Sequence, residues 1–190
     1  GRIEWRKRAG KLANLEKEIS EEPLPDTTIG IGHTRWATHG APNDRNAHPH
    51  LGHERRVAVV HNGIIENFDD LRARLEDDDH QLVSETDTEV AAHLLELQVA
   101  SGEDLTTAMQ RVCQMLEGAF TLVAVDAEDP DRVVAARRNS PLVVGVGEGE
   151  NFLGSDVAAF IEHTREALEL GQDQVVTITR DGVSVTDFSG

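Results

Sequence analysis

The spacing of apolar residues changes near Gly118, and this change constrains the fold of the 190-residue chain more than any other feature. Before Gly118, apolar residues recur three and four positions apart over 67–77, 86–102 and 104–117, which is typical of amphipathic helices. After Gly118, short apolar runs are separated by Asp-Pro, Ser-Pro and Gly-rich turns, which is typical of antiparallel strands. Helices and strands that are segregated along a chain indicate the α+β class. We therefore predict one α+β domain over residues 1–190, without internal repeats.

Two strands are predicted before the helices, at Thr28–Ala37 and Val57–Val60, and a short amphipathic helix near Leu12–Ile19 precedes both. The Pro-, Asn- and His-rich residues 38–53 between these strands predict a long loop. The strands predicted after Gly118 are Phe120–Asp126, Arg132–Arg137, Leu142–Val146, Asn151–Ser155, Gln174–Thr179 and Val183–Phe188. An Asp-Gly pair between the last two predicts a hairpin.

The net charge limits the partners that the chain can have. It contains 35 acidic and 18 basic residues, which gives a net charge of −17. Such a field repels phosphate backbones and anionic lipid surfaces, so neither nucleic acid nor a membrane is an expected partner. No run reaches the roughly 18 apolar residues of a membrane span, and residues 1–6 lack the apolar core of a signal peptide, so we expect a cytoplasmic protein. Closely spaced acidic side chains repel one another little in concentrated salt. The excess of acidic residues therefore suggests a surface adapted to high salt.

The first cluster of candidate functional residues is Gly32–Gly40, where a cation, two hydroxyls and two imidazoles follow an apolar segment. The planar guanidinium of Arg35 suits a carboxylate, and neighbouring hydroxyls can add donors. A structural ion pair explains Arg35 equally well from composition alone.

The second and third clusters also allow two interpretations each. Asn62 and Gly63 can present a side-chain amide and a backbone N–H to one oxyanion, but Asn-Gly after a strand is most often a turn. Asp87 lies between Thr86 and Glu89, which fit a helix capping box. In the first turn of a helix Asp87 complements the helix dipole, and if it faces a pocket it can receive an ammonium group.

Several histidines lie between residues 33 and 61: His33, His39, His48, His50, His53 and His61. Metal ligands usually have a fixed spacing with Cys or carboxylates nearby, and only 48–53 is compact, so we expect neither a metal nor another cofactor. Glycines at 145, 147 and 149 precede a strand rather than a helix, which argues against a phosphate loop. The single cysteine, Cys113, lies on an apolar helix stripe and is expected to be a buried thiol.

Four motifs, taken in order, resemble one family. They are Gly-His-Thr-Arg-Trp-Ala-Thr-His-Gly (32–40), Asn-Ala-His-Pro-His (46–50), Val-Val-His-Asn-Gly-Ile-Ile-Glu-Asn (59–67) and Ser-Glu-Thr-Asp-Thr-Glu-Val (84–90). Together they are similar to the glutaminase domain of the glutamine–fructose-6-phosphate aminotransferases, which make glucosamine 6-phosphate. The similarity continues to the end of the chain.

The resemblance implies two groups of site residues. Those that contact L-glutamine or gate ammonia transfer would be Arg35, Trp36, Thr38, His39 and Asp87. In this assignment Arg35, with Thr38 and His39, holds the α-carboxylate, Asp87 takes the α-ammonium, and Trp36 helps to gate ammonia passage. The catalytic pair, Asn62 and Gly63, would form the oxyanion hole.

The fold implied by the resemblance is that of the N-terminal-nucleophile hydrolases, a four-layer αββα sandwich with antiparallel sheets. The nucleophile in that family is an N-terminal Cys whose own α-amino group is the base. The start Gly1-Arg2-Ile3 departs from this pattern. We therefore expect the nucleophile segment and the first strands, together with the sugar isomerase domains of a homodimeric parent chain, to be absent. We expect no glutamine hydrolysis by the chain as written.

Two alternatives remain open on sequence grounds. The glutaminase domains of amidophosphoribosyltransferase and asparagine synthetase are related enzymes, but the strings at 34–39 and 84–89 fit the aminotransferases better. A glutamine-binding fragment without turnover is the non-enzymatic alternative.

Overall fold

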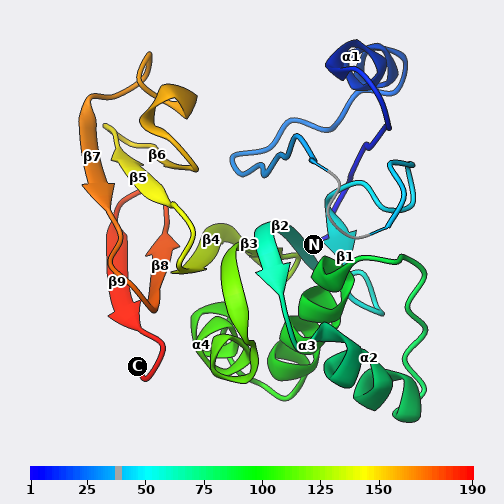
Figure 1. Cartoon of the computed structure of the whole chain (residues 1–190). Helices are drawn as coiled ribbons and strands as arrows, with labels where there is room; N and C mark the ends of the chain where they lie inside the picture. The colour runs from blue at the N-terminus through cyan, green and yellow to red at the C-terminus, as the bar shows by residue number, and fades with distance from the viewer. Residues whose placement is uncertain (37–39) are drawn as a thin grey trace.

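The computed structural model describes residues 1–36 and 40–190, and it forms two antiparallel sheets with helices against the larger one (Figure 1). The larger sheet has the order β1-β2-β3-β4-β8-β9, with strands His50–Leu51, Val57–Ile65, Gly118–Asp126, Asp129–Arg138, Gln174–Ile178 and Val183–Asp187. The smaller sheet has the order β6-β5-β7, with β5 at Val143–Val146, β6 at Asn151–Gly154 and β7 at Glu166–Glu169. The helices are α1 Leu12–Glu21, α2 Phe68–Asp77, α3 Asp87–Ala100, α4 Leu105–Met115 and the 3-10 turn η1 Val157–Ala159.

The two faces of the larger sheet carry separate cores, because successive side chains in a strand point in opposite directions. On one face, Phe120 and Leu122 of β3 pack with α2, α3 and α4. On the other face, Val123 and Val125 of the same strand face a second core that includes Val144 of β5. Each fully buried side chain of this size stabilises the fold by about 1.5–3 kcal/mol. The predicted α+β sandwich is therefore confirmed.

Helix α1 lies apart from the other helices (Figure 1), and none of its residues is buried. Its predicted apolar stripe is present in the sequence but is only partly covered. No helix in the described part of the chain is long and apolar enough to cross a membrane.

The strand predicted at Thr28–Ala37 is wrong: residues 28–36 form no strand, and Ala37 lies outside the described residues. Ile29 and Ile31 pack against the second core, so the alternation reflects burial without strand pairing. The strand predicted at Val57–Val60 is longer than expected, because β2 continues to Ile65. The Asn-Gly pair is consequently not a turn, and the ladder with β3 keeps it extended.

Two smaller differences concern local signals. β7 was not predicted, because its sequence Glu-Ala-Leu-Glu favours a helix and all four residues are exposed. Thr86 caps α3 as predicted, accepting from the backbone N–H of Glu89. The Glu89 carboxylate instead accepts from Ser84 and from the backbone N–H of Val83. The expectation that upstream strands are missing stays a prediction.

Candidate functional site

The candidate site is a pocket of about 230 Å³ beside the second half of β2, where four segments of the chain meet. Its lining is His33, Thr34, Arg35, Trp36, His48, His61, Asn62, Gly63, Thr86, Asp87 and Thr88. Five of the seven residues assigned to the site from the sequence therefore lie together. The other two, Thr38 and His39, lie outside the described residues.

Strand β2 directs consecutive side chains to opposite sides of the larger sheet. His61 points to the helical side, is buried, and lies with Nδ1 3.0 Å from Thr88 Oγ1. The same nitrogen lies 3.7 Å from a carboxylate oxygen of Asp87. Asn62 points the other way, and its Nδ2 donates to Ser155 Oγ at 2.9 Å.

The amide of Asn62 is oriented by His33, whose Nε2 lies 2.7 Å from Asn62 Oδ1. An amide oxygen only accepts, so Nε2 of His33 carries the proton. Burial lowers the pKa of His33, which keeps the ring neutral near pH 7. The Asn62 oxygen is thereby fixed toward His33 and the NH₂ group toward the opposite side.

Gly63 meets a steric requirement of the strand. Its φ is +121°, and a Cβ there would lie 2.1 Å from the carbonyl oxygen of Ala119 and 2.8 Å from Cα of Phe120. Only glycine fits a backbone in this conformation against a neighbouring strand. The site thus requires Gly63 for close packing between β2 and β3.

Asp87 is the first residue of α3 and is 3% exposed. Its Oδ2 accepts from the backbone N–H of Ile65 at 2.9 Å, which joins the end of β2 to the start of α3. A carboxylate in this first turn also complements the positive end of the helix dipole. Asp87 therefore has a structural role in joining β2 to α3. It also lines the pocket, where a ligand can reach it.

Arg35 is held by the loop that follows it. Its guanidinium donates to the backbone oxygens of Ala41 at 3.2 Å and Gly40 at 3.3 Å. Trp36 is 90% exposed and stands at the pocket rim. The guanidinium group of Arg35 is thus held at one wall of the pocket, and the side chain of Trp36 faces solvent.

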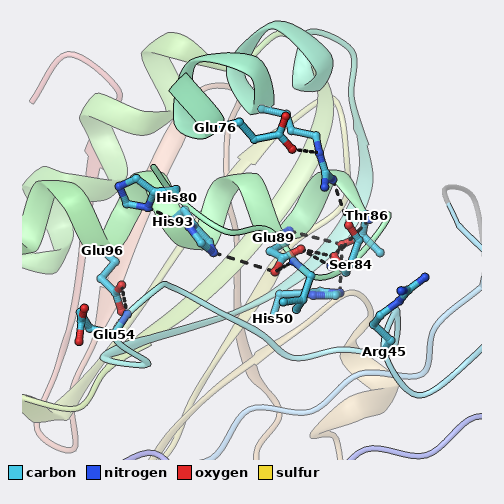
Figure 2. Close-up of polar contacts among 12 residues, drawn as sticks. Arg45, His50, Glu54, Glu76, His80, Ser84, Thr86, Glu89, His93 and Glu96 are labelled. Atoms are coloured by element: carbon cyan, nitrogen blue, oxygen red, sulfur yellow. Dashed lines mark hydrogen bonds and ion pairs between the residues drawn. The ribbon is translucent and has the colours of Figure 1, made fainter. Parts of the chain in front are cut away.

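A buried polar network behind the pocket fixes the loop before α3 (Figure 2). Burial tends to raise the pKa of Glu89, but hydrogen bonds from Ser84 and Val83 outweigh it, so the pKa lies below its usual value. Thr86 Oγ1 lies 3.1 Å from Nε2 of His50, whose pKa is lowered to about 4 by burial and by the charge of Lys7.

A second anchor joins the loop before β1 to the same segment. Asn46 is buried, donates to Glu85 Oε2 at 2.7 Å and accepts from the Glu85 backbone N–H at 3.0 Å. His48 stacks on His33 with ring centres 4.1 Å apart, and burial lowers the pKa of His48 strongly. The sequence predicted neither contact; Asn46 and Glu85 are 39 residues apart, and such a pairing leaves no local signal.

Cys113 is fully buried on α4 and does not line the pocket within the described residues, as the sequence predicted. Burial raises the pKa of its thiol far above the usual value, which suppresses the thiolate. Cys113 is therefore part of the core on the helical side of the larger sheet.

The architecture has solved counterparts, which define its class. The glutamine phosphoribosylpyrophosphate amidotransferase from B. subtilis matches with a TM-score of 0.68 and 25% identity, over 82% of this chain and 34% of that one. A glutamine aminotransferase class-II domain protein from Silicibacter pomeroyi matches in fold, with a TM-score of 0.54 and 22% identity over 76% of this chain and 71% of that one. The fold is that of the N-terminal-nucleophile amidotransferases.

The family follows from the sequence comparison. The model of the glutamine amidotransferase domain matches residues 20–189, so the chain belongs to this family. It is 68% identical over 190 residues to a glutamine–fructose-6-phosphate aminotransferase (isomerizing) from Streptomyces coelicolor. It is 57% identical over 195 residues to a protein of the same name from Mycobacterium tuberculosis. In both comparisons all of this chain is covered, and it spans 31% of the relative's length.

Proposed function

We propose that residues 1–190 are the glutaminase domain of a glutamine–fructose-6-phosphate aminotransferase and that the pocket binds L-glutamine. The observation that carries the proposal is that Arg35, Asn62 and Asp87, from three distant segments, line one pocket. Glutamine is a zwitterion with an amide at its far end, and these side chains supply a cation, an anion and an amide donor. The 56–68% identity to aminotransferases favours this assignment over an amidophosphoribosyltransferase.

Each end of the ligand has a complementary partner. The guanidinium of Arg35 would bind the α-carboxylate through two parallel N–H donors, with Thr38 and His39 adding further donors. The Asp87 carboxylate would bind the α-ammonium, and its burial strengthens that attraction. Trp36 at the exposed rim would gate the ammonia that leaves.

The oxyanion donors would be the Nδ2 group of Asn62 and the backbone N–H of Gly63. His33 and Ser155 support this by holding the Asn62 amide in one orientation. Preorganised donors stabilise the charge that develops on the amide oxygen during attack, and removing one such donor typically costs about 10²–10³ in rate.

The nucleophile in this proposal lies outside the 190 residues, because Cys113 is the only cysteine in them and is buried. The chain alone would then bind glutamine without releasing glutamate. In the full-length protein, sugar isomerase domains would receive the ammonia, and the parent would be a homodimer.

Calorimetric titration of the purified chain with L-glutamine tests the proposal. We expect saturable binding of one glutamine per chain, weakened roughly tenfold or more, or about 1.4 kcal/mol, by Arg35→Ala and by Asp87→Asn. Asn at position 87 keeps an oxygen for the Ile65 N–H, so its effect reports the lost charge. Arg111→Ala, at an exposed ion pair away from the pocket, is the matched control.

Absence of binding by the folded wild-type chain, or equal affinities in all variants, would overturn the glutamine site. A different outcome would be release of glutamate by the chain, abolished by Arg35→Ala. It would overturn the proposal that the nucleophile lies outside the 190 residues, and the glutamine site would stand.

A further inference from the structure

The contact between Asn62 and Ser155 joins the two sheets at one side chain of the glutamine pocket. Asn62 lies on β2 of the larger sheet, and Ser155 directly follows β6 of the smaller sheet. Nδ2 of Asn62 donates to Ser155 Oγ at 2.9 Å, across 93 residues of sequence. Ser155 is not among the described residues that line the pocket, so its effect on a ligand must act through Asn62.

The side-chain amide of Asn62 is held at both of its ends. A carboxamide is planar, with an oxygen that accepts and two N–H groups that donate. His33 bonds the oxygen, and Ser155 takes one of the two N–H groups. A single hydrogen bond to the oxygen would leave the plane of the amide able to rotate, whereas the second bond fixes it. The other N–H of Nδ2 is the donor that remains for a ligand, and the two contacts set its direction.

The turn that carries Ser155 folds back closely on the end of β6. A Cβ on Gly154, the last residue of β6, would lie 2.9 Å from Cβ of Ala159 and 3.0 Å from the carbonyl oxygen of Asp156. The Asp156 carboxylate accepts from the backbone N–H of Ala158 at 2.8 Å and caps η1. This compact turn holds the backbone of Ser155 in one place.

Phe160, the residue after η1, anchors the far end of the turn. Its side chain is 2% exposed and stacks on Phe152 of β6, with ring centres 6.1 Å apart. Gly145 of β5 lies against the ring, where a Cβ would come within 2.6 Å of it. The smaller sheet therefore fixes both ends of the turn, and with them the position of Ser155.

We propose that Ser155 is a positioning residue for the amide end of glutamine. It directs the remaining N–H of Asn62 toward the side-chain amide oxygen of the ligand, and the smaller sheet holds Ser155 where this contact requires it. This role rests on the proposed function, in which Arg35 and Asp87 bind the α-carboxylate and the α-ammonium. Ser155 should therefore affect the amide end of the ligand and leave the α-groups unaffected.

L-Norvaline separates the two ends of the ligand, because it has the α-groups and carbon chain of glutamine with a methyl group in place of the amide. Titration of the purified chain with each amino acid, followed by NMR, gives both affinities. Ser155→Ala should weaken glutamine binding roughly threefold to tenfold and leave norvaline binding unchanged. Ser155→Thr keeps the hydroxyl and should restore glutamine binding. Ser184→Ala, at an exposed serine of β9, is the matched control and should bind both amino acids as the wild type does.

The side-chain amide signals of Asn62 report the contact without any ligand. Their loss in Asn62→Asp identifies them. We expect the signal of the N–H that is bonded to Ser155 to shift in Ser155→Ala and to keep its position in Ser155→Thr.

Equal glutamine affinities in wild type and Ser155→Ala, or an equal loss of affinity for glutamine and norvaline, would overturn the positioning role and leave the glutamine site in place. Asn62 amide signals that do not change in Ser155→Ala would overturn it as well. Absence of glutamine binding by the folded wild-type chain would instead overturn the proposed function, and the positioning role with it.

Discussion

Replacing His50 by Gln should make the protein more resistant to acid. His50 is 3% exposed, and burial together with Lys7 lowers its pKa from 6.5 to about 4. Above pH 6.5 the ring is neutral in both the folded and unfolded states. As the pH falls below 6.5, the unfolded chain takes up a proton that the folded chain accepts only near pH 4, so stability is lost over that interval.

The magnitude follows from the size of the shift. One pKa unit corresponds to about 1.4 kcal/mol, so His50 should lower the free energy of unfolding by about 2 kcal/mol at pH 5 and about 3 kcal/mol at pH 4. Glutamine does not titrate, and its amide can still reach Thr86 Oγ1 in place of Nε2 of the ring. The variant should therefore lack this portion of the acid sensitivity.

Urea unfolding of both proteins at pH 7, 6, 5 and 4, at constant ionic strength, measures the effect. The difference between wild type and His50→Gln should move in favour of the variant by about 3 kcal/mol from pH 7 to pH 4. Carboxylates titrate in both proteins and cancel in the difference. His163→Gln, at an exposed position, is the control. Parallel pH profiles for wild type and His50→Gln would refute the assignment of a buried neutral imidazole.

Three further predictions concern the fold and the surface. Gly63→Ala should lower the free energy of unfolding, measured in urea, by more than about 2 kcal/mol. Gly102→Ala, also at positive φ but with open space around it, should lower it by about 1 kcal/mol. Equal losses would contradict a clash between a Cβ at position 63 and the backbone of β3. Arg56→Ala leaves the buried Asp126 carboxylate without its two 2.8 Å hydrogen bonds and should lower the free energy of unfolding by about 3 kcal/mol. Arg111→Ala, at an exposed pair, should lower it by less than about 1 kcal/mol. A similar loss in both variants would be inconsistent with a buried pair at Arg56 and Asp126. The net charge is −17, so salt should reduce the repulsion within the folded chain. The melting temperature should therefore increase when sodium chloride is raised from about 0.01 M to about 1 M, because the Debye length falls from about 30 Å to about 3 Å. A constant melting temperature would count against a surface adapted to high salt.

The elements with strong local signals are those that the sequence predicted well. Helix α4 begins after Asp104, whose carboxylate caps it, and Cys113 lies in the core as its helical spacing indicated. Where local and tertiary preferences compete, the sequence is misleading. Asn62-Gly63 has the composition of a turn, but pairing with Thr121 and Phe120 extends β2 through it.

In the candidate site, too, the sequence predicted some features and missed others. Motif order was enough to select Arg35 and Asp87, which line the pocket. The contacts that orient Asn62 come from His33, 29 residues away, and Ser155, 93 residues away. Neither partner has a spacing that could reveal the contact, because strand pairing and sheet packing bring the segments together.

A crystal structure of the chain with L-glutamine tests the central claim most directly. The account predicts the α-carboxylate on the guanidinium of Arg35, the α-ammonium on Asp87, and the side-chain amide oxygen within hydrogen-bond distance of Asn62 Nδ2 and the Gly63 N–H. Glutamine bound elsewhere, or bound in this pocket with its amide toward Arg35, would contradict the account.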